Sequence, residues 1–357
     1  MMFDLLKKIT KKNLKNFIPY ESARTLKKKG DIWLNANELP HDINIKIQHN
    51  MLNRYPENQP KELIEQYAKY SYVDFNNIII TRGADEGIEL LMKAFCEPNI
   101  DAIITFPPTY PMYKVNAEIM GIQNHEISLI NDHWDINFIK IQKISKNIKI
   151  IYICRPNNPT GHIIKLNTII FLLKFFIKTA LVVVDEAYIE FSIKNNLSFL
   201  INDFPNLVLL RTLSKAFGLA GLRCGFILSN VKIINVLKNI ITPYPIASVV
   251  SNIAVHFLNQ NMIKTMQQRV KKINETKVWF IQQLKHVKYI KKIFNSEGNY
   301  VLLELFEFNS IINYLSHSGI VIRPQNDKIL LQNHIRISIG TKEDCLEVLR
   351  IFKEYSL

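Results

Sequence analysis

The sequence has 357 residues, of which 48% are hydrophobic and 21% are charged, so it can bury a substantial core and is expected to form one large domain and a smaller one. Lys and Arg number 45 against 31 Asp and Glu, and the resulting net charge of +14 would suit nucleic acid, an acidic membrane surface or small anionic ligands. The lysines are spread from Lys7 to Lys353, however, and no basic tract is interleaved with aromatic residues as in proteins that bind single strands. We therefore expect no nucleic-acid partner and keep nucleic-acid binding only as an alternative.

Cysteine spacing and apolar segments indicate the compartment. The four cysteines lie far apart: Cys96, Cys154, Cys224 and Cys345. This spacing favours neither a zinc site nor a disulfide framework, so we expect a cytoplasmic protein without a metal. The first 17 residues lack the continuous apolar core of a secretory signal and are interpreted as part of an N-terminal arm. The most apolar segment, 169–177, is interrupted by Lys174 and too short to cross a bilayer, which predicts a buried helix and no membrane span.

Short apolar runs alternate with helical patterns along the first two-thirds of the chain. In chain order these runs are 78–80, 102–105, 148–153, 181–184 and 207–210. Such alternation predicts an α/β fold in which helices flank a mostly parallel central sheet. Each run ends in polar or turn residues, and open parallel sheets bind ligands beyond the carboxyl ends of their strands. The sequence therefore predicts one ligand site built from five loops.

The pattern changes after Pro243 and Pro245. One long helical pattern extends from about Ala247 to Leu284, and shorter strands are expected near 300–303 and 335–338. We interpret this part as a connecting helix and a smaller C-terminal α/β domain, to which the N-terminal arm contributes. The expected boundaries are 1–35 for the arm, 36–245 for the large domain, and 246–357 for the connecting helix and the small domain.

Two of the expected strand ends carry groups suited to a phosphorylated heterocycle. The segment 83–95 opens a helix with a glycine turn, where free backbone N–H groups and the helix dipole would suit a phosphate, although an ordinary capped helix begins in the same way. Asp185 could keep a heterocyclic nitrogen protonated, with Tyr188 reaching a neighbouring phenolic oxygen. A metal-binding pair of Asp185 and Glu186, or a plain helix N-cap, remains the alternative.

Lys215 stands in an apolar, glycine-containing stretch, TLSKAFGLAGLR at 212–223, which is an unusual setting for an ammonium group. Desolvation and a nearby cation lower the pKa of a lysine from about 10.4, so that its amine can form a Schiff base with an aldehyde. Ser214 and Arg223 could both bind a phosphate. Together with Asp185 for a pyridine nitrogen, these residues indicate pyridoxal 5′-phosphate, although each alone could be structural.

These motifs resemble those of the fold-type I aminotransferases, which use pyridoxal 5′-phosphate. Three stretches carry the resemblance to the superfamily: RPNNPTG at 155–161, VDEAYIEF at 184–191 and TLSKAFGLAGLRCGF at 212–226. Four more make it closer to the histidinol-phosphate aminotransferases: LNANE at 34–38, NRYPENQP at 53–60, TRGADEGIELL at 81–91 and PPTYPMY at 107–113. The resemblance covers nearly the whole chain and implies a fold-type I transferase that forms a homodimer with shared active sites.

The resemblance implies a role for each matching residue. Lys215 would hold the cofactor and move a proton at the substrate Cα, and Asp185 would pair with the pyridine nitrogen. Asn158 and Tyr188 would bind the phenolic oxygen of the ring, on which Tyr110 would stack. The cofactor phosphate would be bound by the backbone of Ala84 and Asp85, by Ser214 and Arg223, and by Tyr55 of the partner subunit. Packing in a core or an interface is the alternative for Tyr55 and Tyr110.

The implied substrates are histidinol phosphate and glutamate or 2-oxoglutarate. Arg336 matches the arginine that binds the substrate carboxylate in the superfamily, and Arg323 matches a second arginine for anionic groups. Tyr20 and Asn37 match further positions of the substrate pocket, although either could be a turn residue. Histidinol phosphate carries a phosphate and glutamate two carboxylates, so one pocket lined by arginine must accept both, as a bidentate guanidinium can. Surface ion pairing is the alternative for both arginines.

Three positions depart from the pattern of the family. Arg155 stands where a small residue is common, Gly218 where alanine is common, and Pro324 follows Arg323. Arg155 would add a positive charge close to the cofactor loop, and Pro324 could shift the reach of Arg323. Amino transfer from histidinol phosphate is the expected activity. Decarboxylation of phosphorylated amino acids, transamination of aromatic ones, and nucleic-acid binding on a catalytically inactive scaffold remain the alternatives.

Overall fold

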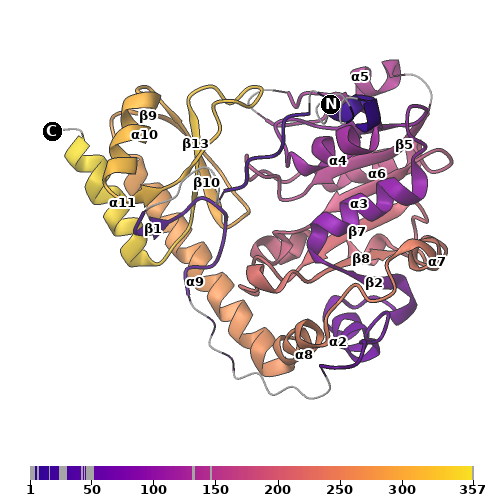
Figure 1. Ribbon diagram of the computed structural model, residues 1–357. Coiled ribbons are helices and arrows are strands. Elements are labelled where there is room, and N and C mark those ends of the chain that lie inside the picture. Colours follow the sequence, from indigo (N-terminus) through magenta and orange to yellow (C-terminus); the bar gives the residue numbers. More distant parts are fainter. Residues whose placement is uncertain are drawn as a thin grey trace.

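Figure 1 shows the computed structural model of the chain, in which a long helix leads from a large sheet with helices on both faces to a smaller sheet. The structure describes residues 5, 8–15, 17–23, 30–41, 43, 45, 52–130, 133–144 and 147–355. Parts of the N-terminal arm expected over 1–35 therefore lie outside the described residues. Within the described ranges, no helix is both long enough and apolar enough to cross a bilayer.

The large sheet has seven strands in the part of the chain that the structure describes. Their order across the sheet is β2 (Ile78–Thr81), β8 (Gly225–Ser229), β7 (Leu207–Thr212), β6 (Leu181–Asp185), β5 (Ile148–Cys154), β3 (Ala102–Thr105) and β4 (Gln123–Glu126). Only β8 runs against its neighbours, and the other pairs are parallel. The predicted mostly parallel sheet is thus confirmed, and the five apolar runs of the sequence form β2, β3, β5, β6 and β7.

Two strands of this sheet were not among the predicted elements. The edge strand β4 consists of Gln123, Asn124, His125 and Glu126, and none of these side chains is fully buried, so it carries no apolar run. Strand β8 is apolar and buried, but it follows directly on the glycine-containing stretch after Lys215 and was interpreted only as part of that motif. The sequence did not predict these two strands, because neither is an apolar run set apart from its neighbours by helical patterns.

Helices cover both faces of the large sheet. Alternate residues of one strand separate these faces: Val183 packs in the apolar cluster with α3, α4 and α7, whereas Val182 and Val184 pack in the cluster that contains α2 and α6. The helices are α2 (Lys61–Ser71), α3 (Gly83–Phe95), α4 (Met112–Met120), α5 (Phe138–Lys143), α6 (Leu166–Phe175) and α7 (Val231–Ile240). Short 3₁₀ helices are η1 (Lys12–Leu14), η2 (Phe75–Asn77), η3 (Ile189–Asn195), η4 (Ser198–Leu200) and η5 (Ala220–Leu222).

The apolar segment 169–177 lies in and after α6, but it is not a fully buried helix as predicted. Ile169 and Leu172 are buried against the sheet, whereas Phe171 and Phe175 are 42% and 48% exposed. An isolated apolar run does not reveal which side of a helix faces solvent when the outer side is itself aromatic.

The expected single helix over 247–284 is two helices, α8 (Ser248–Phe257) and α9 (Gln260–Leu284). The prediction was wrong because Asn259 caps the second helix: its side-chain oxygen accepts a hydrogen bond from the backbone N–H of Met262 at 2.9 Å. Helix α9 is the long connection to the smaller sheet in Figure 1.

The smaller sheet is antiparallel, and its strand pairing places two arginines side by side. Its order is β12 (Arg323–Pro324), β13 (His334–Ser338), β10 (Tyr300–Leu305) and β9 (Ile290–Phe294). Arg323 on β12 is the register partner of Arg336 on β13. The remaining helices of this part are α10 (Phe308–His317) and α11 (Lys342–Tyr355).

The N-terminal segment joins the smaller sheet's side of the molecule. Strand β1 (Ile32–Trp33) pairs in parallel with β11 (Ile320–Val321), and the N–H of Leu34 donates to the carbonyl of Val321 at 2.7 Å. This pairing carries residues 34–38 between the two sheets, where they reach the pocket described next. The domain boundaries 1–35, 36–245 and 246–357 stay a prediction.

Candidate active site

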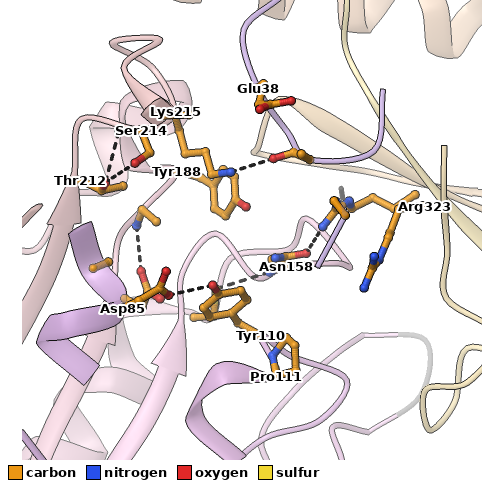
Figure 2. A pocket seen from close by; sticks show the side chains of 18 of the residues that line it. Glu38, Asp85, Tyr110, Pro111, Asn158, Tyr188, Thr212, Ser214, Lys215 and Arg323 are labelled. Atoms are coloured by element: carbon orange, nitrogen blue, oxygen red, sulfur yellow. Dashed lines mark hydrogen bonds between the residues drawn. The ribbon is translucent and has the colours of Figure 1, made fainter. Parts of the chain in front are cut away.

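A pocket lies at the carboxyl ends of the parallel strands, and the small sheet closes its other side. Figure 2 shows most of the side chains that line it, with Lys215 and Arg323 in separate parts of the pocket. The lining includes every predicted site residue except Asn37 and Tyr55: Tyr20, Ala84, Asp85, Tyr110, Asn158, Asp185, Tyr188, Ser214, Lys215, Arg223, Arg323 and Arg336. The structure thus brings together side chains that are up to 316 positions apart in the sequence, from Tyr20 to Arg336.

Lys215 follows β7 and points into the pocket. Its Nζ donates to the carbonyl oxygen of Ala36 at 2.8 Å and lies 5.5 Å from the centre of the Tyr188 ring. Burial, and next the positive charge of Arg336, lower the pKa of Lys215 to about 8. An amine of this pKa is neutral near pH 7 far more often than an ordinary lysine and can attack a carbonyl carbon.

Asp185 ends β6 on the pocket floor and is almost completely buried. Its Oδ2 accepts a hydrogen bond from the hydroxyl of Tyr113 at 2.7 Å, and its Oδ1 accepts one from the N–H of Ala187 at 3.0 Å. Burial nevertheless raises the pKa of Asp185 to about 6, because these two bonds only partly replace water. A cation beside this carboxylate would stabilise its charged form and lower its pKa again.

Glu186, the neighbour of Asp185, does not share the pocket. Its Oε2 lies 2.6 Å from Nη2 of Arg211 in a buried ion pair, and its Oε1 accepts from the N–H of Leu197. The two acids point apart because successive side chains of a strand face opposite sides of the sheet. Among the described residues, no group of three or more His, Cys, Asp or Glu is placed to hold a metal ion.

The N-terminus of α3 forms the end of the pocket suited to a phosphate. Arg223 lies there with its Nη2 3.3 Å from Oδ2 of Asp85 and its Nη1 3.3 Å from Oγ of Ser214. A side chain on Gly83, whose φ is +74°, would come within 2.6 Å of the Arg223 guanidinium. The glycine therefore lets the guanidinium, the serine hydroxyl and the first N–H groups of the helix meet at one point.

Tyr110, after β3, is fixed at this end by its hydroxyl, which donates to Oδ1 of Asp85 at 2.8 Å. Thr212 also lines the pocket, and its hydroxyl donates to Oγ of Ser214 at 2.9 Å. Tyr113 and Thr212 were not predicted as site residues. Both stand in motifs already quoted, but only the fold shows that one reaches Asp185 and the other Ser214.

Asn37 lies behind the pocket wall and positions Tyr188. Its Nδ2 donates to the Tyr188 hydroxyl at 3.1 Å, and its own Oδ1 accepts from the hydroxyl of Ser338 at 3.0 Å. Asn37 adopts φ of +52°, which asparagine tolerates better than most residues. The residue is therefore placed to act through Tyr188.

Asn158 and two arginines form the opposite end of the pocket. Nη1 of Arg336 donates to Oδ1 of Asn158, and its Nη2 donates to the carbonyl of Asn35, both at 2.6 Å. Nη2 of Arg323 donates to the carbonyl of Glu21 at 2.9 Å, and its guanidinium lies 6.0 Å from the ring centre of Tyr20. Among the described residues, Nε of Arg336 and Nη1 of Arg323 are buried and have no hydrogen-bond partner. Such donors suit an anionic ligand.

Tyr55 lies away from this pocket. It is 80% exposed, and its ring stacks on that of Tyr244 with the centroids 4.4 Å apart. The role implied for Tyr55, on the cofactor of a partner subunit, stays a prediction.

Arg155 does not act on the pocket as expected. The guanidinium is buried and donates from Nε to the carbonyl of Ile164 at 2.8 Å and from Nη1 to that of Asn195. The expectation of a positive charge beside the cofactor loop was wrong, because the side chain turns away and binds backbone oxygens. Gly218 adopts φ of +73°, for which glycine is better suited than alanine.

The donor set fits pyridoxal 5′-phosphate. Lys215 offers an amine of lowered pKa, and Asp185 offers a buried carboxylate whose hydrogen bonds with the described residues come from neutral groups. Ser214 and Arg223 offer a phosphate site at a helix N-terminus. All four line one pocket at the strand ends. The fold and the pocket together define a pyridoxal-phosphate-dependent transferase of fold type I.

Comparisons with known proteins agree with this class. The family model of aminotransferase class I and II matches residues 29–352. Histidinol-phosphate aminotransferases of Buchnera aphidicola from Schlechtendalia chinensis and Melaphis rhois are 49% and 47% identical to the chain, each match covering 98% of both proteins. The solved histidinol-phosphate aminotransferase of Sinorhizobium meliloti in complex with pyridoxal-5′-phosphate has a TM-score of 0.82 at 19% identity, covering 97% of this chain and 98% of that one, and supports the fold. The chain belongs to the class I and II aminotransferases.

Proposed function

We propose that the protein transfers an amino group from histidinol phosphate to 2-oxoglutarate, giving imidazole-acetol phosphate and glutamate, as a step of histidine biosynthesis. The observation that carries this proposal is the identity of 47–49% to histidinol-phosphate aminotransferases over 98% of the chain. The pocket supports it, because a lysine of lowered pKa and a cluster of cations line the same cavity. A substrate with an amine at one end and an anionic group at the other can reach Lys215 and the cluster of cations at the same time.

When bound, pyridoxal 5′-phosphate supplies an aldehyde that combines with amines and a ring that accepts electrons from the substrate Cα. Lys215 would hold the cofactor through Nζ, and the same Nζ would take the proton from the substrate Cα. Its pKa of about 8 makes the neutral amine available for that transfer. Asp185 would stabilise the positive charge of the pyridine nitrogen, and its burial excludes the water that would weaken this pairing.

The remaining residues bind and orient. Ser214, Arg223 and the backbone of Ala84 and Asp85 would hold the cofactor phosphate, while Asn158 and Tyr188 would bind the phenolic oxygen, and Tyr110 would cover the ring. Arg323 and Arg336 would bind the anionic end of each substrate, with Tyr20 beside them. Because a phosphate and a carboxylate both accept two parallel N–H bonds from a guanidinium, the same arginines can serve both half-reactions.

A homodimer with shared active sites is part of the proposal. Tyr55 lies in an exposed stack with Tyr244 and away from the pocket of its own chain, so a partner subunit is the site it can serve. We expect a mixture of Lys215→Ala and Tyr55→Ala subunits to regain activity that neither variant has alone, because one site of the mixed dimer is intact. No recovery from co-refolded mixtures would contradict the shared site. A cytoplasmic location and the three predicted domain boundaries belong to the same proposal.

The test of the proposed activity is amino transfer by the purified, cofactor-loaded protein. Histidinol phosphate and phenylalanine are compared as amino donors to 2-oxoglutarate, and carbon dioxide release from O-phosphothreonine is monitored in parallel. We expect kcat/KM for histidinol phosphate to exceed that for phenylalanine by at least about a hundredfold, since only the former offers a phosphate to the two arginines. A preference for phenylalanine, or release of carbon dioxide, would assign one of the alternative activities.

A further inference from the structure

Lys328 is a third cation in the anion-binding part of the pocket. It lies in the loop between β12 and β13 and lines the same cavity as Arg323 and Arg336. Its sequence context gives no sign of this role, because a lysine between Asp327 and Ile329 in a polar loop is expected on a solvated surface. The fold instead places it beside the two strands that carry the arginines.

The loop that carries Lys328 has a defined backbone. The N–H of Lys328 donates to the carbonyl of Gln325 at 3.0 Å, and its carbonyl accepts from the N–H of Leu331 at 3.1 Å. Gln325 is itself fully buried, and its N–H donates to the carbonyl of His334 on β13 at 2.9 Å. The lysine is therefore held in a turn attached to the strand of Arg336, rather than carried by a free loop.

The same part of the pocket contains donors that lack acceptors. Nε of Arg336 and Nη1 of Arg323 are buried without a hydrogen-bond partner among the described residues. Buried donors without an acceptor are costly, so the two guanidiniums keep hydrogen-bonding capacity that the described residues do not use. The bonds that the two guanidiniums do make go to the carbonyls of Glu21 and Asn35 and to Asn158, which are neutral groups.

The charge of Lys328 responds to these neighbours. Burial, and next the positive charges of Arg336 and Arg323, lower its pKa to about 7, whereas Asp327 raises it. The N-terminal segment brings two more titratable groups to the cavity, Tyr20 and Glu38. An anion bound between the three cations would favour the ammonium form of Lys328.

We propose that Lys328 makes the third cationic contact to the anionic end of the substrate and favours a phosphate dianion over a carboxylate. The inference rests on the proposed function and deepens it. Two guanidiniums can each engage two oxygens of a carboxylate or a phosphate, but a phosphate offers a third terminal oxygen that a carboxylate lacks. A long, flexible side chain that ends in an ammonium, on a loop beside them, can bind that third oxygen as a point charge.

Binding of a phosphate beside Lys328 should be coupled to proton uptake. In the free enzyme above pH 7 much of Lys328 is neutral, and binding of a phosphate dianion raises its pKa, so the complex takes up a proton. Affinity for the dianion should then fall as the pH rises from 7 to 9, by up to about tenfold per pH unit. A residue that merely supported the loop would give no such uptake.

The experiment compares Lys328→Met, Lys328→Arg and Lys178→Met in the cofactor-loaded enzyme. Lys178→Met removes the same charge from an exposed site outside the pocket and is the matched control. We expect Lys328→Met to raise KM for histidinol phosphate by about ten- to a hundredfold and KM for 2-oxoglutarate by only a few-fold, with kcat little changed. Lys328→Arg should restore most of the loss. If KM for histidinol phosphate in Lys328→Met stays within twofold of the Lys178→Met control, the inference is overturned.

Calorimetric titration with inorganic phosphate tests the inference without turnover. At pH 8, in two buffers of different ionisation enthalpy, the loaded wild-type enzyme should take up a proton on binding phosphate, and Lys328→Met should bind at least about tenfold more weakly without that uptake. Equal binding and equal uptake in both proteins would overturn the inference. If wild type transfers no amino group from histidinol phosphate, the proposed function has failed, and this titration still decides the role of Lys328. The visible absorbance of the loaded variants checks that they are folded, and Lys328→Gln replaces the methionine variant if that one is not.

Discussion

The two ends of the pocket differ in how their charges are balanced. At the end beside α3, the charged groups pair with one another: Arg223 contacts Asp85, and Asp85 also accepts from Tyr110. At the end beside β12 and β13, Arg323 and Arg336 bond to neutral oxygens and keep buried donors without a partner among the described residues. The charges of the first end are balanced by its own residues, whereas the second end keeps positive charge that an anionic ligand would balance. We therefore expect substitutions at the first end to alter cofactor binding and kcat, and those at the second to alter KM.

The largest expected effect is at Lys215. Lys215→Ala should lower kcat for amino transfer by at least about a thousandfold and abolish the visible absorbance of the lysine-bound cofactor, since no other described amine lines that part of the pocket. Lys277→Met is the matched control, because burial also lowers the pKa of Lys277 to about 8. Its Nζ donates to the carbonyl of Gly298 at 2.7 Å, outside the pocket. We expect that control to lose stability and keep its absorbance; an unchanged band in Lys215→Ala would refute the assignment.

Asp185→Asn should lower kcat by about a hundred- to a thousandfold, because an amide does not hold the positive charge of the ring nitrogen. The substitution keeps the shape of the side chain, so the far-ultraviolet circular dichroism should not change. Steady-state kinetics with saturating cofactor measure the effect. A loss confined to KM for histidinol phosphate would place Asp185 at the wrong end of the pocket.

The same substitution has an opposite effect on the stability of the cofactor-free protein. The pKa of Asp185 is raised to about 6 in the folded state, from about 3.9 in the unfolded chain. Its contribution to stability is thus full below pH 4 and is lost as the pH rises through 6. The difference in Tm between Asp185→Asn and wild type should therefore grow in favour of the variant from pH 4 to pH 7. A difference that does not change with pH would contradict the raised pKa.

At the other end of the pocket, Arg323→Gln should raise KM for histidinol phosphate by about ten- to a hundredfold and leave cofactor affinity unchanged, because the guanidinium lies beside Tyr20 and Glu21 and is proposed to bind the substrate anion rather than the cofactor. Initial rates at varied substrate, together with absorbance titration of the cofactor, separate the two quantities. If Arg323→Gln instead lowers cofactor affinity and leaves KM for histidinol phosphate unchanged, the distinction between the two ends is wrong.

The sequence predicted the part of this pocket that depends on local signals. Five apolar runs fix the strand ends, and Asp185 and Lys215 stand directly beyond two of them, so their convergence follows from the geometry of a parallel sheet. Arg323 and Arg336, in contrast, were assigned only through a family resemblance. That they are register partners on adjacent antiparallel strands is a long-range fact that no local pattern contains.

The site residues that the sequence did not predict also depend on long-range contacts. Lys328 and Tyr113 carry no signal of their own, because a lysine in a polar loop and a tyrosine in a helix are ordinary, and only tertiary packing gives them a partner. Arg155 was expected to act on the site and does not. Its position in the sequence suggested a charge beside the cofactor, but its side chain points to backbone carbonyls instead. Direction of a side chain is set by its packing neighbours, which lie far away along the chain.

Tyr113→Phe offers the smallest and most specific test of the part of the pocket around Asp185. The tyrosine hydroxyl donates to Oδ2 of Asp185, so its removal leaves a buried carboxylate oxygen with one bond fewer at a cost of about 1–3 kcal/mol. The pKa of Asp185 should rise further, and cofactor affinity at pH 7 should fall by about tenfold, with less loss at pH 8 where Asp185 stays ionised. Tyr152→Phe is a matched control: the Tyr152 ring stacks on that of Tyr113 at 4.8 Å, but its hydroxyl donates to the carbonyl of Ile88. Absorbance titrations of the cofactor at both pH values should therefore separate the two variants. Equal losses in both would mean that the stack of rings, rather than the hydrogen bond, maintains Asp185.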